Sequence, residues 1–222
     1  MNQIKIDKII RSRRKSIALV ISPDATLVVR APLWISLEYI KNLVFKKRFW
    51  IRKKQQQVLR NGGLARAKEF TDGEEFLYLG ETYKLRIQNR EDIKLADYLY
   101  FPEKHLNLGR AKMIEWYRER AREIITERAN WYSQMTGWKF KSISITTAKR
   151  RWGSCGPNGS INFSFRLVMA PRSVIDYVVA HELAHIPEKN HSAIFWDKVR
   201  MVLPDYKIRR KWLREKERSL NI

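Results

Sequence analysis

Several residue types that build common protein sites are scarce in this 222-residue chain. It has a single cysteine, Cys155, which excludes an intramolecular disulfide and any zinc site made of clustered thiolates, so we expect Cys155 to be a small packing residue. No apolar run approaches the ~18 residues that a membrane-spanning helix needs. The polar start at residues 1–7 lacks the apolar core of a signal peptide. These absences predict a cytoplasmic protein without a membrane partner.

Acidic residues are scarce as well. The chain has 23 aspartates and glutamates against 45 lysines and arginines, which gives a formal net charge of +22. Such a surface attracts polyanions, including nucleotides and nucleic acid, although a solvated basic surface is an equally good reading. No recognised nucleic-acid motif organises the basic residues, which are spread along the whole chain. Charge therefore leaves a nucleotide or nucleic-acid partner possible without assigning one.

Hydrophobic periodicity predicts an α+β fold in which small antiparallel or mixed sheets pack on helices. We expect a boundary near residues 102–108. It would separate a β-rich N-terminal subdomain with one long helix, residues 1–105, from a helix-led subdomain, residues 106–222. The expected elements are a hairpin over 16–21 and 26–30, a helix over 36–60 closed by Asn61-Gly62-Gly63, strands over 75–79, 82–88 and 92–101, a helix over 109–135 stopped by Gly137, and strands over 142–146 and 159–165.

The strand expected over residues 159–165 alternates strictly between two faces. Ile161, Phe163 and Phe165 share one face, and Asn162 lies on the other between two serines. An extended peptide can bind a protein by adding to the edge of such a strand. An ordinary half-buried strand explains the same alternation, and both readings stand.

Histidine is rare too, yet three of the four histidines lie within eleven residues. Apolar residues at helical spacing precede them, and Pro171 and Ser173 suit the first turn and cap of that helix. Residues i and i+4 share a helix face, so His181 and His185 can present two imidazole nitrogens to one Zn²⁺ ion. Glu182 stands beside them, where a general base for metal-bound water is needed. The alternative is a helix that carries buried, hydrogen-bonded histidines.

The third histidine, His191, can join this site only if the helix ends before it. An unbroken helix would rotate His191 by about 240° from His185. Pro187 supplies the break, because proline lacks an N–H and disfavours helical angles in the residue before it. Either Asn190 or Ser192 can then cap a new helix, whose apolar side we expect to be Ile194, Phe195, Val199, Val202 and Leu203. Three protein ligands would leave a fourth metal position open, as in catalytic zinc sites.

Several segments together resemble the YgjP-like family of zinc metallopeptidases, which is related to SprT-like and gluzincin-type hydrolases. They are Arg151-Trp152-Gly153-Ser154-Cys155, residues 176–185, Asn190-His191-Ser192 with Phe195-Trp196, Arg11 to Ile17, Pro204-Asp205-Tyr206, and Trp212-Leu213. The resemblance implies that the three histidines bind zinc, that Glu182 is catalytic, and that residues 106–222 form a zincin-like half with its metal helix behind a small sheet. Glu188 stands where metzincins carry glycine, which excludes that class.

The leading hypothesis is a zinc-dependent hydrolase that cleaves peptide bonds in a peptide or protein substrate. Arg151 and Tyr206 are candidate donors to the oxyanion, and Trp152, Asn162 and Asn190 are candidate substrate-binding or ligand-supporting residues. One alternative keeps the metal but makes the substrate a nucleoside triphosphate, as in a pyrophosphatase, or a protein bound to nucleic acid. Three imidazoles favour zinc over the carboxylate-bound Mg²⁺ of phosphoryl chemistry. A third alternative is a nucleic-acid-binding module with a structural zinc.

Overall fold

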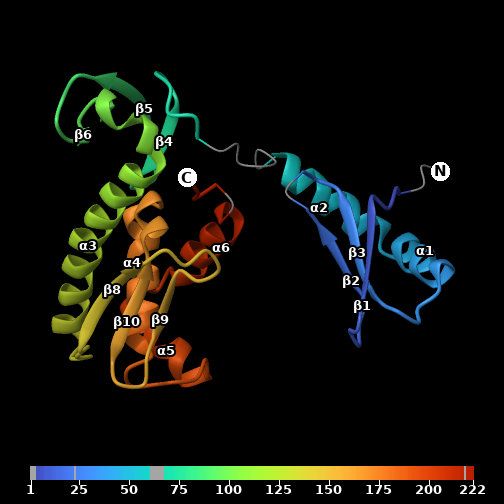
Figure 1. Cartoon of the computed structure of the whole chain (residues 1–222). Coiled ribbons are helices and arrows are strands. Elements are labelled where there is room, and N and C mark those ends of the chain that lie inside the picture. Colours follow the sequence, from blue (N-terminus) through green and yellow to red (C-terminus); the bar gives the residue numbers. More distant parts are fainter. Residues whose placement is uncertain (1–3, 23, 61–67, 218) are drawn as a thin grey trace. The chain divides into compact units, whose positions relative to one another are not determined.

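The structure is a computed structural model that describes residues 4–22, 24–60, 68–217 and 219–222. The chain forms two compact units, Met1–Arg66 and Ala67–Ile222 (Figure 1). This division differs from the expected boundary between residues 105 and 106. Phe76 and Phe101, which lie before that boundary, belong to the same buried cluster as Met113 and Tyr117 after it. A shared core therefore joins the strands before residue 105 to the long helix that follows.

The first unit contains a three-stranded sheet of order β1-β3-β2. Its strands are β1 (Lys8–Ser12), β2 (Ala18–Ile21) and β3 (Leu27–Pro32). The antiparallel pairing of β2 with β3 confirms the predicted hairpin. The parallel strand β1 was not predicted, because its residues, Lys-Ile-Ile-Arg-Ser, do not alternate between apolar and polar.

Two helices, rather than the predicted single one, complete the first unit. They are α1 (Leu37–Lys46) and α2 (Arg48–Arg60), and the chain bends at Lys47 between them. The predicted stop at residues 61–63 lies outside the described residues. Both helices pack on the sheet (Figure 1). The core that they share with the strands consists of Ile21, Leu27, Val29, Ala31, Ile40, Val44, Ile51 and Val58.

The second unit begins with a four-stranded mixed sheet of order β4-β5-β7-β6. Its strands are β4 (Glu75–Tyr78), β5 (Glu81–Gln88), β6 (Lys94–Leu95) and β7 (Leu99–Pro102). A 3-10 turn, η1 (Glu103–Leu108), leads into the long helix α3 (Gly109–Thr136). Gly137 ends α3 in the left-handed conformation at φ 75°, which confirms the predicted stop.

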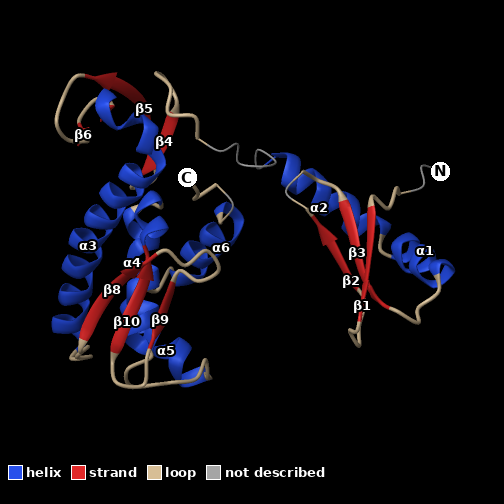
Figure 2. Ribbon diagram, in the orientation of Figure 1, coloured by secondary structure: helices blue, strands red, loops and turns tan. Residues whose placement is uncertain are grey.

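A second mixed sheet, of order β8-β10-β9, lies near the histidine helix. It consists of β8 (Ser142–Thr146), β9 (Gly153–Cys155) and β10 (Ser160–Ser164), and a 3-10 turn, η2 (Phe165–Met169), follows it. Strand β10 is the middle strand, paired on both sides (Figure 2). The reading of residues 159–165 as a free edge is therefore wrong; in this sheet the edges are β8 and β9.

Three helices follow: α4 (Arg172–Ala184), α5 (Ala193–Val202) and α6 (Tyr206–Lys216). Helix α4 contacts α3, α5, α6 and strand β9, so it lies at the centre of this unit. Pro171 precedes its first turn without a side-chain cap, and Ser173 lies inside that turn rather than capping it. The predicted α+β class with small mixed sheets is confirmed. No helix in the described ranges is long and apolar enough to cross a membrane.

Candidate metal centre

The end of α4 and the start of α5 hold the three clustered histidines. Helix α4 ends at Ala184 with His185 as its C-terminal cap residue, two residues before Pro187. Ser192 caps α5, because its Oγ accepts a hydrogen bond from the Phe195 backbone N–H at 3.2 Å. Of the two predicted caps, Ser192 rather than Asn190 is used. The intervening turn breaks the helix where the sequence required it.

The turn brings one ring nitrogen from each of His181, His185 and His191 to within 4.8 Å of the others. The Nε2 atoms of His181 and His191 are 3.0 Å apart. Zinc binds imidazole nitrogens at about 2.0–2.1 Å, so two nitrogens on one tetrahedral ion lie roughly 3.4 Å apart. The triad therefore fits a single metal ion without rearrangement of the helices.

The Nδ1 atom of His185 already has a hydrogen-bond partner in the backbone. This atom lies 3.1 Å from the carbonyl oxygen of Glu188, and a proton on Nδ1 donated to that oxygen leaves the lone pair of Nε2 free. Burial lowers the pKa of His185 and lowers the pKa of His181 to about 3. Both rings are therefore neutral at pH 7, which is the form that binds a metal.

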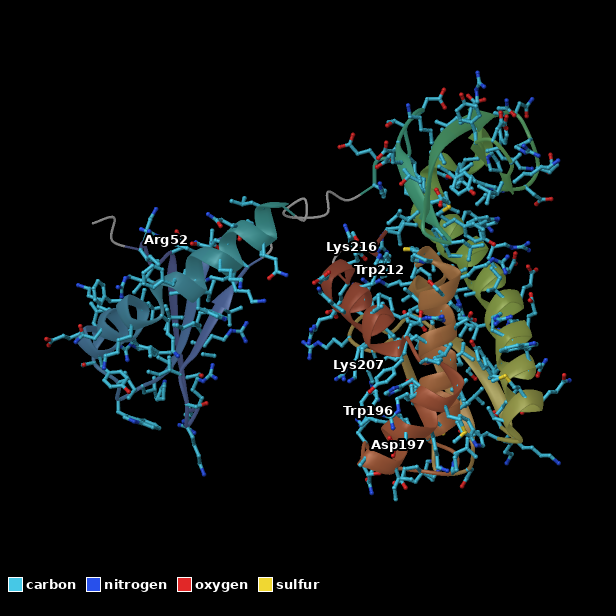
Figure 3. All side chains as sticks on the ribbon, turned by 180° about the vertical axis from the view of Figure 1, so that it is seen from behind. Arg52, Trp196, Asp197, Lys207, Trp212 and Lys216 are labelled. Atoms are coloured by element: carbon cyan, nitrogen blue, oxygen red, sulfur yellow. The ribbon has the colours of Figure 1, made fainter. Side chains whose placement is uncertain are left out.

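Aromatic side chains of α5 and α6 pack around the triad, a supporting role that the sequence did not assign to them. The ring of Phe195, fully buried, lies with its centroid 4.4–4.9 Å from the centroids of all three histidine rings. Trp196, which projects from α5 in Figure 3, stacks on His191 at 5.7 Å. Tyr206 stacks in turn on Trp196 at 5.3 Å. Such packing restricts the ring rotations that would disperse the three nitrogens.

Glu182 is almost completely buried, and burial raises its pKa to about 7. Its side chain packs against Gly153 at the start of β9. A Cβ atom at Gly153 would lie 2.6 Å from both Cγ and Oε1 of Glu182, so only glycine leaves room for this carboxylate. The glycine of the R-W-G-S-C segment thus has a steric role that its sequence position alone did not reveal.

The known proteins that this chain is similar to include metallopeptidases. The sequence profile of a family described as YgjP-like, metallopeptidase domain, matches residues 15–216. The chain belongs to the YgjP-like family. Its structure is also similar to the crystal structure of the metallopeptidase zymogen of Pyrococcus abyssi abylysin, at 20% identity and a TM-score of 0.39, over 42% of this chain and 96% of that chain. No curated protein matches the chain.

Membership of the YgjP-like metallopeptidase family makes this chain a metal-dependent hydrolase of the peptidase type. Among the described residues, the three histidines form the group of side chains that could hold a metal ion. The family profile spans both compact units, so the first unit is part of the family's architecture rather than an unrelated addition.

Of two further candidates of this YgjP-like chain, Asn162 lies on β10 and Arg151 lies two residues before β9. Asn162 pairs with Ser154 across β9 and β10, and adjacent strand residues face opposite sides of a sheet. Because Gly153 faces Glu182, Ser154 and Asn162 face the other side. There they line a groove of about 290 Å³ together with the exposed Arg151.

The other residues that the sequence singled out lie in different surroundings. Tyr206 is buried, and a single ring, that of Trp196, separates it from His191. Asn190 is exposed in the α4–α5 turn, where its N–H donates to the Glu188 carboxylate at 3.4 Å. The ring of Trp152 lies 5.3 Å from the Arg166 guanidinium. Cys155 is half-buried and packs against the core, close to the packing role expected for it.

Proposed function

We propose that this chain is a zinc-dependent peptidase in which His181, His185 and His191 hold one Zn²⁺ ion and Glu182 is the general base. The observation that carries the proposal is the convergence of three imidazoles beside a single buried carboxylate. The donor set contains nitrogen alone, which suits zinc better than the oxygen-preferring Mg²⁺ or Ca²⁺. When bound, zinc supplies Lewis acidity, which polarises a carbonyl and lowers the pKa of coordinated water to near 7.

Glu182 has the properties that proton transfer at neutral pH requires. A pKa of about 7 lets its carboxylate accept a proton and release it again with little cost in either direction. In the proposed reaction the Glu182 carboxylate takes a proton from the attacking water and delivers it to the leaving amine nitrogen. Gly153 allows the carboxylate to occupy this position, because a Cβ atom at residue 153 would clash with it.

Strand β9 is the proposed binding edge for the substrate. It pairs with β10 on one side and ends the sheet on the other. Its first residue, Gly153, touches Glu182. An extended peptide added along β9 would gain backbone hydrogen bonds and bring a carbonyl group beside the catalytic carboxylate. Tyr206 is the proposed oxyanion donor, because it stacks on Trp196, which itself stacks on His191.

The test is a substrate screen with purified protein loaded with zinc. Unfolded protein and peptide mixtures form one arm, and nucleoside triphosphates form the other. We expect cleavage of peptides that stops when a chelator removes the metal and returns when zinc is added back. Release of pyrophosphate from nucleotides without peptide cleavage would instead assign the pyrophosphatase alternative. A zinc-loaded protein that hydrolyses neither class would contradict the proposed function.

A further inference from the structure

The first unit has a surface that the hydrolytic site does not use. Residues 45–54 read Phe-Lys-Lys-Arg-Phe-Trp-Ile-Arg-Lys-Lys, across the bend between α1 and α2. Apart from Ile51, which is buried in the core, every residue of this segment is aromatic or cationic. We call the side chains of residues 45–50, with Lys53 and Lys54, the elbow surface.

The rings of the elbow surface are held out toward solvent. Phe45 is 57% exposed, Phe49 is 70% exposed and Trp50 is 43% exposed. The core of the unit is already filled by Ile40, Val44 and other aliphatic side chains, so the three rings are not needed to complete it. Three exposed aromatic residues within six positions of one small unit indicate a binding surface.

The cluster is also preorganised. The guanidinium of Arg48 lies 4.4 Å from the ring centroid of Phe45 and 4.5 Å from that of Phe49. Its Nη1 donates a hydrogen bond to the Phe45 carbonyl oxygen at 3.1 Å, which fixes the side chain between the two rings. The elbow surface thus presents two aromatic rings and one planar cation in a contiguous array.

The charge around this array is strongly positive. The first 60 residues contain fifteen lysines and arginines but only three acids, Asp7, Asp24 and Glu38. Two of these acids already accept hydrogen bonds next to the sheet: Asp7 from the Leu27 N–H and Asp24 from the Thr26 N–H. The occupant of the elbow surface must therefore carry repeated negative charge as well as flat apolar faces.

We propose that the elbow surface binds single-stranded nucleic acid, with bases stacked on Phe45, Phe49 and Trp50 and phosphates paired with the surrounding lysines. Exposed base faces and a regularly charged backbone are the two features that this surface complements. In a duplex the bases already stack on one another, so the rings would have no partner. The inference is independent of the hydrolytic reaction proposed for the second unit.

A membrane is the less suitable occupant. Helices that lie in a membrane surface separate an apolar face from a cationic face. On the elbow surface the Arg48 guanidinium lies over the rings themselves, so inserting the rings into acyl chains would carry a charge with them. The unstacked bases of a single strand can stack both on aromatic rings and on guanidinium planes.

The test measures binding of the full-length protein to fluorescently labelled oligo(dT) by anisotropy at near-physiological salt. The aromatic variant, Phe45→Ala with Phe49→Ala and Trp50→Ala, keeps every charge. We expect removal of each stacking ring to weaken binding about tenfold, so the triple variant loses roughly two to three orders of magnitude of affinity. The matched control replaces exposed apolar residues of the second unit, Ile194→Ala, Met201→Ala and Ile208→Ala, and should bind as the unaltered chain does.

Two further measurements separate stacking from charge. Arg48→Lys keeps the charge but removes the planar group, and we expect a severalfold loss of oligo(dT) affinity. Lys46→Ala with Lys47→Ala should instead reduce the slope of log affinity against log salt, by about 0.7 for each phosphate that the protein no longer neutralises. Circular dichroism and thermal melting confirm that each variant remains folded.

Three results would overturn the proposal. The first is an aromatic variant that binds oligo(dT) as tightly as the unaltered protein, which would mean that charge alone attracts the strand. The second is equal affinity for duplex and single strand. The third is binding to vesicles of phosphatidylserine and phosphatidylcholine without binding to oligo(dT), which would assign a lipid surface. Peptide cleavage measured on the same preparations shows separately whether the hydrolytic proposal holds.

Discussion

The two compact units place their chemically active side chains in opposite ways. In the described ranges, nine of the fifteen exposed large hydrophobic side chains belong to the first unit, although it makes up under a third of the chain. The buried polar or charged residues, Ser164, Arg166 and Glu182, all lie in the second unit. The first unit therefore offers its rings and charges to a partner at the surface.

The second unit instead buries the carboxylate of Glu182 in its core, where low polarity raises the pKa of this group. Burial raises the pKa of Glu182 to about 7, so its carboxylate can exchange a proton near neutral pH. Burial also lowers the pKa of His181 to about 3, so its imidazole is neutral and able to bind a metal. No comparable shift is needed for stacking and charge pairing at an exposed surface. The difference agrees with the two proposals, that the first unit binds a nucleic-acid strand and that the second unit catalyses hydrolysis.

Among the variants that test this division of roles between the two units, removal of a proposed metal ligand should have the largest effect. His181→Ala deletes one of the three converging nitrogens, so we expect bound zinc to fall from about one ion per chain to near zero, with hydrolysis falling to background. Elemental analysis after dialysis measures the metal. His105→Ala is the matched control, since His105 lines a groove beside α3 and lies outside the triad. Retention of zinc by the His181 variant would remove it from the ligand set.

A smaller effect on activity is expected from substitution of Gly153, which only positions the carboxylate of Glu182. Gly153→Ala would place a Cβ atom 2.6 Å from Glu182, so the carboxylate must shift. Because displacement by about 1 Å can cost 10²-fold in rate, we expect kcat to fall roughly 10- to 100-fold with zinc fully retained.

Gly156→Ala is the control for this variant. Its Cβ would meet chiefly the Ser160 hydroxyl, which can rotate away, so activity should be nearly unchanged. A Gly153→Ala enzyme with unaltered kcat would show that the carboxylate has other room to move.

The smallest effect on catalysis is expected from the core of the first unit. Ile51 is fully buried there, and Ile51→Ala should lower the free energy of unfolding of that unit by about 2–4 kcal/mol. Zinc content and cleavage of a short peptide should not change. Urea unfolding followed by circular dichroism measures the stability, and Leu59→Ala, at an exposed position, should cost under about 0.5 kcal/mol. Loss of zinc in Ile51→Ala would contradict the division of roles.

Local spacing was enough to predict that the three histidines cluster. His181 and His185 share a helix face at i and i+4, and Pro187 required the break that returns His191 to them. The strand and helix periods likewise predicted the hairpin β2–β3 and the end of α3 at Gly137. These features depend on interactions between residues close in the sequence.

Long-range pairing could not be predicted from the same patterns. The contact between Gly153 and Glu182 joins residues on two different elements, and nothing in the periodicity of either element reveals it. The position of β10 between β8 and β9 depends on partners on both sides. For this reason the sequence did not show that Asn162, in the alternating strand expected over residues 159–165, faces away from α4. The break between α1 and α2 falls at Lys47, where no proline or glycine marks it.

Glu182→Gln tests the central claim most directly, because it removes the proton acceptor while keeping the size of the side chain. We measure zinc per chain and peptide cleavage on one preparation, with Glu188→Gln as the control at a nearby glutamate. The account predicts one bound zinc and a loss of cleavage of about 10²- to 10⁴-fold in Glu182→Gln, with little change in the control. Full cleavage by Glu182→Gln, or loss of its zinc, would contradict the assignment of Glu182 as the general base.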